Sequence, residues 1–218
     1  MREIKGWARL PISILLVGVA VFHLYTAMFG VFQPRIQRGV HLMVLVPMAF
    51  LLFPATKKSP TNRPTIVDIV LAVTAAIPPI YIMLANDRLN LRYALLDPLL
   101  PIEVVLGAIN IILVIEALRR AVVPAMAILV GVFFAYLFTS PMLPGIFYNR
   151  PISIAQAIEI NYLITNAGIY GTIVGVTATF VALFVIFGAF MQNTNTGEYF
   201  TMLATKLAGN GPGGPAKI

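Results

Sequence analysis

The side chains best suited to chemistry in this chain are polar groups set inside long apolar stretches. Such groups are costly to place within a membrane, so each is a candidate functional residue by default. A histidine there could relay a proton or hold a ligand, and amide, carboxyl or hydroxyl groups could line a polar path between helices. The candidates are His23, His41, Glu103, Asn110, Thr177 and Thr179.

Each candidate also has a structural interpretation, which we favour. A lone neutral histidine more often bonds to a backbone carbonyl, and neither His23 nor His41 has a partner at metal-ligand spacing. Glu103 and Asn110 share a helical face and could form a polar seam toward another helix. However, Glu103 closely follows Pro101, and the dipole at a helix start favours an acid. The two threonines can return hydrogen bonds to their own helix.

Catalytic signatures are absent from the sequence. It contains no HExxH, GxSxG or Walker-type loop, and its aspartates lie at the edges of apolar runs. The chain has no cysteine, which excludes disulfides, thiolate nucleophiles and cysteine-ligated metals. We therefore expect neither an enzyme nor a bound cofactor.

The apolar runs that hold these groups dominate the composition. Hydrophobic residues make up 59% of the 218 residues and charged residues only 11%, which is not the composition of a soluble domain. About 20 apolar residues cross the hydrocarbon core of a bilayer as a helix. We predict an all-α integral membrane protein with about six transmembrane helices, near residues 10–32, 39–54, 66–85, 101–118, 121–139 and 171–191.

Three of these spans have unusual features. Pro78 and Pro79 are expected to kink or end the third span near its far side. The fourth is short between its charges, and its Glu116 can pair with Arg119 or Arg120 one turn later. Those arginines leave only a tight corner before the fifth run, which is either a separate span or a tilted connecting helix.

The basic residues divide unequally between the two sides if the spans alternate. Ten of the fifteen fall on the side of the N-terminus, which the positive-inside rule places in the cytoplasm. We assign the net charge of +7 to this bias and expect no nucleic-acid partner. The five on the other side are Arg35, Arg38, Arg88, Arg92 and Arg150.

A short amphipathic helix is predicted within residues 152–165, between the fifth and sixth spans. Its apolar side would consist of Ile154, Ala157, Ile158 and Leu163. We expect this helix to lie on the outer membrane surface or to re-enter slightly.

The last span carries a face of small residues at helical spacing. In lipid there is little hydrophobic drive between helices, so small residues matter because they let another backbone approach. Ordinary helix packing is the interpretation that we favour for this face. Its members are Gly171, Gly175, Ala178, Ala182 and Ala189.

The same region carries a family resemblance. Residues 166–190 read NAGIYGTIVGVTATFVALFVIFGAF, and GGPAK follows at 213–217. This series resembles the fused permeases of tripartite ATP-independent periplasmic (TRAP) transporters, and in particular the TAXI type with four plus twelve spans. The specific part covers about residues 140–218, and Leu143-Pro-Gly-Ile also fits the family pattern.

The resemblance implies a domain organisation. Residues 1–120 would form a small four-helix scaffold domain, and 121–150 a connecting transmembrane helix and loop. Residues 151–218 would begin a large transport domain, which we expect to continue beyond Ile218.

The resemblance also implies a function. Such a permease sits in the inner membrane and imports a small organic anion, delivered by a periplasmic solute-binding protein, with an ion gradient and no ATP. The implied coupling ion is sodium, with its site in the large domain and not in this chain. Partners would then be the binding protein, the remainder of the permease, the lipid bilayer and the anion.

Two other classes stay open at this point. A non-transporting membrane scaffold or assembly subunit would use the six helices only to bind another membrane protein. A channel formed by oligomers would need a polar stripe along several spans, and only the seam from Glu103 to Asn110 approaches one.

Overall fold

The computed structural model describes residues 2–4, 6, 9–56 and 58–208, and every regular element among them is helical. The GGPAK motif at 213–217 lies outside the described residues. The elements are α1 (Arg9–Phe29), α2 (Pro34–Leu52), α3 (Ile66–Leu84), α4 (Asn86–Leu91), α5 (Pro101–Ala121), α6 (Pro124–Thr139), η2 (Ser140–Met142), η3 (Gly145–Phe147), α7 (Ile154–Tyr162), α8 (Thr172–Val176), η4 (Thr177–Val181), α9 (Ala182–Asn193) and α10 (Thr196–Ala208).

Six helical segments of the described chain are long and apolar enough to cross a membrane. This confirms the predicted all-α fold with six spans, although several ends differ by a few residues. The fifth run forms a span of its own, so the chain is a multi-pass membrane protein. The segments are Arg9–Phe29, Pro34–Leu52, Ile66–Leu84, Pro101–Ala121, Pro124–Met142 and Thr172–Asn193.

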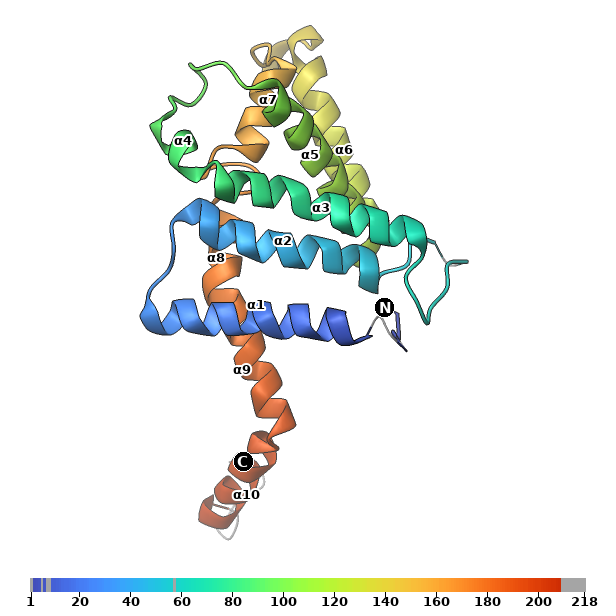
Figure 1. Cartoon of the computed structure of the whole chain (residues 1–218), viewed down its shortest axis with the longest axis vertical. Coiled ribbons are helices and arrows are strands. Elements are labelled where there is room, and N and C mark those ends of the chain that lie inside the picture. The colour runs from blue at the N-terminus through green and yellow to red at the C-terminus, as the bar shows by residue number, and fades with distance from the viewer. Residues whose placement is uncertain (1, 5, 7–8, 57, 209–218) are drawn as a thin grey trace.

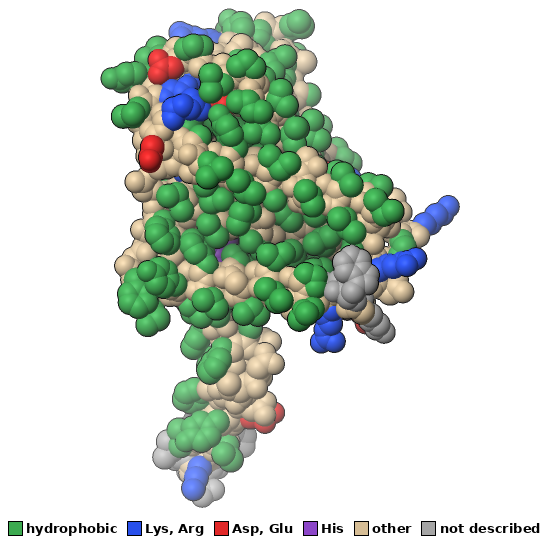
Figure 2. All heavy atoms as spheres, in the orientation of Figure 1, with side chains coloured by type: hydrophobic (Ala, Val, Ile, Leu, Met, Phe, Trp, Pro, Cys, Tyr) green, Lys and Arg blue, Asp and Glu red, His purple; other side chains and the backbone are tan. Residues whose placement is uncertain are grey.

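An antiparallel pair, α2 and α3, forms the centre of the structure (Figure 1). Helix α1 lies along the other side of α2, while α5 contacts both α2 and α3 and carries α6 and α7. At one core contact, Ala72 and Ala75 of α3 are buried with Phe50 of α2 and Leu113 of α5. Hydrophobic side chains also spread over the outer surface, where they suit contact with lipid tails (Figure 2).

A partly buried ion-pair group, the Asp68 cluster, joins the N-terminal segment to two helices. It consists of Arg2, Asp68, Glu116, Arg119 and Arg120. Nη2 of Arg2 and Nη1 of Arg120 each lie 2.7 Å from a different carboxylate oxygen of Asp68. Nε of Arg120 lies 2.6 Å from Glu116, and Nε of Arg119 lies 2.7 Å from it, which confirms the pairing predicted for Glu116. The cluster fixes the start of α3 against the end of α5.

The opposite end of the α2–α3 pair holds a second polar group. Nδ2 of Asn86 donates to Oε1 of Gln33 at 2.7 Å, which joins the end of α3 to the start of α2. Arg88 of α4 forms an ion pair with Glu103 at the start of α5. Charged groups therefore gather at the two ends of the helices, as alternating membrane spans require.

The expected break at Pro78 and Pro79 does not end α3, which continues to Leu84. Both prolines are fully buried. Neighbouring helices and polar side chains commonly stabilise prolines within membrane helices. Here, the hydroxyl of Tyr162 in α7 donates to the Pro78 carbonyl at 2.9 Å. Burial raises the pKa of the Tyr162 phenol well above its usual range, so the hydroxyl remains a donor.

The predicted amphipathic helix forms as α7, but its buried side faces protein. Ala157 and Ile158 are buried against the core and Leu163 follows them, whereas Ile154 is 68% exposed. The carboxylate of Glu159 anchors the helix: Nη1 of Arg92 lies 2.7 Å from its Oε1. Periodicity identified the apolar side without showing that α5 covers it.

The close approach of α7 to α5 depends on Gly107. A Cβ added there would lie 3.0 Å from Cδ1 of Tyr162 and still closer to Cγ2 of Ile158. We expect Gly107→Ala to lower the free energy of unfolding by about 1–3 kcal/mol, because α7 must shift. Thermal unfolding of the purified chain in detergent measures the effect.

Gly131→Ala in α6 is the matched control, because nothing lies within 4 Å of an added Cβ there. The same change should leave the melting temperature unchanged or raise it through better helix propensity. Equal melting temperatures for the two variants would contradict the contact between α5 and α7.

Candidate functional site

The last span contains a π turn, η4, between α8 and α9. The N–H of Ala182 there donates to Thr177, five residues back, in place of Ala178. π turns within α-helices are frequent at functional sites. The span runs across α1 and α2 at this turn (Figure 1).

Polar groups meet where these three helices cross. Nε2 of Gln37 in α2 donates to the Ala178 carbonyl at 3.0 Å and to Oγ1 of Thr26 in α1 at 3.2 Å. The Thr26 hydroxyl in turn donates to the His23 carbonyl at 3.1 Å. We name this group the polar crossing: His23, Thr26, Gln37, His41 and the Ala178 carbonyl. Its four polar side chains are each at most 4% exposed.

The two histidines, expected to be separate, are brought together in the polar crossing. Nε2 of His23 lies 3.1 Å from Nδ1 of His41, so one ring donates its proton to the other. They lie on different helices, α1 and α2, so their spacing in the sequence did not indicate this contact. No third histidine or acid of the described chain joins them as a potential metal ligand. The two rings therefore form a hydrogen-bonded pair.

The small-residue face meets this crossing only in part. Ala178 is fully buried and Gly171 is also buried, whereas Ala189 is exposed. Gly175 and Ala182 are half-buried between them. Helix α2 contacts α8 and η4 in the first half of the span, whereas α1 contacts η4 and also α9 in the second half.

The two candidate threonines bond to their own helix. The hydroxyl of Thr177 donates to the Ile173 carbonyl and that of Thr179 to the Gly175 carbonyl, both at 2.9 Å. These bonds confirm the expectation that the two hydroxyls return hydrogen bonds to their own helix. Thr177 nevertheless lines a cavity of about 250 Å³ together with His23 and His41.

Two arginines of α2 hold the turn before the last span, a role that the sequence did not reveal. Nη1 of Arg38 donates to the carbonyls of Thr165 and Tyr170, the latter at 2.6 Å. Nη2 of Arg35 lies 3.4 Å from the Leu163 carbonyl. In the sequence, this role is indicated only by the position of the two arginines in the first turns of a span. We name these contacts the arginine clamp.

The seam from Glu103 to Asn110 begins with a helix cap at the start of α5. Glu103 is fully buried, and its carboxylate accepts the Leu100 N–H at 2.8 Å, which confirms the expected helix cap. The hydrogen bond to Glu103 raises the pKa of Arg88. Asn110 is 5% exposed, and its Nδ2 has no hydrogen-bond partner in the described part of the chain.

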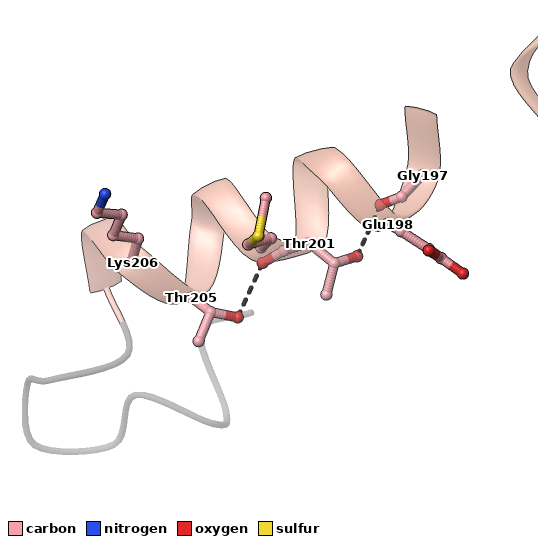
Figure 3. A pocket seen from close by; sticks show the side chains of 6 residues that line it. Gly197, Glu198, Thr201, Thr205 and Lys206 are labelled. Carbon is pink, nitrogen blue, oxygen red and sulfur yellow. Dashed lines mark hydrogen bonds between the residues drawn. The ribbon is translucent and has the colours of Figure 1, made fainter. Parts of the chain in front are cut away.

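A further hollow of about 800 Å³ lies along α10 (Figure 3). The hydroxyls of Thr201 and Thr205 there donate to carbonyls of the same helix, at 2.9 and 2.8 Å. The described residues that line it all come from this one helix, so they do not converge from several elements as the groups of a binding site do.

Comparison with protein families identifies a known family in the second half of the chain. A family model described as "Tripartite ATP-independent periplasmic transporter, DctM component" matches residues 109–218. No curated protein and no solved structure matches the chain. The matched range begins within α5 and contains the last span, so the polar crossing joins matched and unmatched parts.

The small-residue contact provides a direct test of the crossing. We expect Ala178→Leu to lower the free energy of unfolding by about 1–3 kcal/mol, because the added carbons must displace α1 or α2. Ala189→Leu makes the same change on the same span at an exposed position and should have little effect. Melting temperatures in detergent distinguish the two; similar values would show that the crossing does not form.

Proposed function

Because the chain belongs to the DctM component family of TRAP transporters, we propose that it forms part of a permease that imports a small organic anion. Membership makes it a transporter component rather than an enzyme. The observation that carries the proposal is the family match over half of the chain. Import would use an ion gradient, with sodium as the coupling ion, and a periplasmic binding protein that delivers the anion.

We further propose the fused TAXI-type arrangement. Residues 1–120 would be the small scaffold domain, 121–150 the connection and 151–218 the start of the large transport domain. Four spans precede α6, which supports this division. The family match begins earlier, at residue 109 within α5. The last turns of α5 would therefore belong both to the scaffold domain and to the region that the family model covers.

In this proposal the first helices brace the start of the transport domain. Helix α2 supplies both Gln37, which binds the Ala178 carbonyl, and the arginine clamp on the preceding turn. Hydrogen bonds and close approach stabilise helix contacts in lipid, where hydrophobic burial contributes little. Substrate and ion sites would lie in broken helices of the large domain, where helix ends face the ligand, outside residues 1–218.

The proposed location is the inner membrane, with the N-terminus in the cytoplasm. The binding protein would then dock at the end of the bundle that holds α4 and the loop around Arg150. Exposed residues of α7, such as Gln156, would contribute to this surface.

The absence of cysteine makes the orientation easy to test. Asn62 and Asn149 are both exposed, in loops on opposite predicted sides. We expect Asn149→Cys to react with a membrane-impermeant maleimide on intact spheroplasts, and Asn62→Cys to react only after the membrane is opened. The reverse pattern would place the N-terminus outside.

Transport itself is tested in proteoliposomes that contain the complete permease and its binding protein. With an imposed sodium gradient and no ATP, we expect accumulation of at least one radiolabelled carboxylate from a panel. Omission of the binding protein or collapse of the gradient should abolish uptake. A permease that assembles but never accumulates an anion would favour the non-transporting scaffold.

A further inference from the structure

A cavity of about 240 Å³ lies at the N-terminal end of α2, beside the start of the last span. Its polar lining comes from Gln37, Arg38, Thr172 and Thr179, and its apolar lining includes Phe32 and Val176. It is distinct from the cavity at the histidine pair, because neither His23 nor His41 lines it.

Arg38 lines this cavity with a guanidinium group that is only partly hydrogen-bonded. Its hydrogen bonds to the Thr165 and Tyr170 carbonyls both use Nη1. Nε and Nη2 lie on the other edge, each 2.8 Å from where a Cβ of Gly175 would stand. Glycine at this position lets the guanidinium lie close to the helix backbone, and no hydrogen bond of the described chain uses Nε or Nη2. No carboxylate of the described chain pairs with Arg38, so its charge is balanced only by carbonyl dipoles.

Two neighbouring features suit an oxygen-rich anion with a hydrogen-bond donor attached. The first backbone hydrogen bond of the last span runs from the Gly175 N–H to the Gly171 carbonyl, at 3.1 Å. The N–H groups of residues 172–174 therefore have no partner within the helix, and the helix dipole favours negative charge there. Independently, Gln37 is 3% exposed and its Oε1 has no partner, so a donor is missing.

The depth of the cavity indicates where the anion comes from. Arg38 lies four residues after Pro34, where α2 begins, which is about 6 Å along the helix. The headgroup zone on each side of the hydrocarbon core has a similar thickness. Phe32 and Val176, which are 44% and 45% exposed, border the cavity with apolar surface.

We infer that this cavity binds the phosphate of a phospholipid headgroup. The nitrogens of Arg38 that make no hydrogen bond within the described chain can donate to phosphate oxygens, as guanidinium groups commonly do. A headgroup hydroxyl donates to Gln37, and the acyl chains follow the apolar border toward the hydrocarbon core. The lipid thereby occupies the junction between α2 and the last span.

The test is native mass spectrometry of the 218-residue chain in detergent, with phosphatidylglycerol as the probe. We expect one retained lipid. Thr172→Glu should reduce its retention about tenfold or more, because the new carboxylate competes for Arg38. An acid at a helix start does not impair folding. Thr172→Gln is the matched neutral control and should stay within about twofold of the original chain.

Two comparison probes identify the source of the anion. Diacylglycerol with the same chains tests the acyl contacts alone, and inorganic phosphate tests the charge alone. Poor retention of both, with phosphatidylglycerol retained, supports the lipid site. Equal retention of diacylglycerol, displacement of the lipid by millimolar phosphate, or undiminished binding by Thr172→Glu would each overturn it.

Arg38→Gln removes the cation directly, although it also weakens the arginine clamp. We expect at least the loss of retention seen with Thr172→Glu. Gel filtration and circular dichroism establish whether each variant is folded. If Arg38→Gln does not fold, the lipid retention of Thr172→Glu tests the site.

Discussion

Helices in a bilayer gain little by covering one apolar surface with another, because lipid tails already do so. Close backbone approach and hydrogen bonds must hold them together instead. This constraint explains why the contacts that organise this chain involve glycine, alanine and a few polar groups. Ala178 lets the last span reach α1 and α2, and Gln37 then bonds to the carbonyl exposed on that span. The apolar core alone would leave the position of the span undetermined.

Helix α2 connects the parts of the molecule. Along its length it contacts α1, α3, α5 and the last span. Its first turns carry Arg35, Gln37 and Arg38, which bind backbone carbonyls between Leu163 and Ala178. Because backbone acceptors do not depend on side-chain identity, this arrangement places few demands on the sequence that it binds. The family match begins beyond α2, so the unmatched half of the chain contributes these bonds.

The spans could be predicted from the sequence because length and hydropathy largely determine which segments enter a membrane. The cap at Glu103 was equally local, since it depends on residues three positions apart. The histidine pair and the arginine clamp could not be predicted, because their partners lie on segments that are distant along the chain. Periodicity finds the apolar side of α7 but does not tell whether protein or lipid covers it. Likewise, local rules predict a kink or an end at Pro78 and Pro79, but α3 continues through both prolines to Leu84.

The π turn changes the direction in which the side chains of the last span point. Each residue of an α-helix advances about 100° around the axis, and a π turn accommodates one extra residue. The two halves of the span are therefore out of phase by roughly that angle relative to a regular helix. A face drawn at α-helical spacing from Gly171 through Ala178 does not continue to Ala189, which points elsewhere. The turn thus lets one membrane helix present two differently oriented surfaces, so that α2 is contacted by α8 and η4 and α1 by η4 and α9.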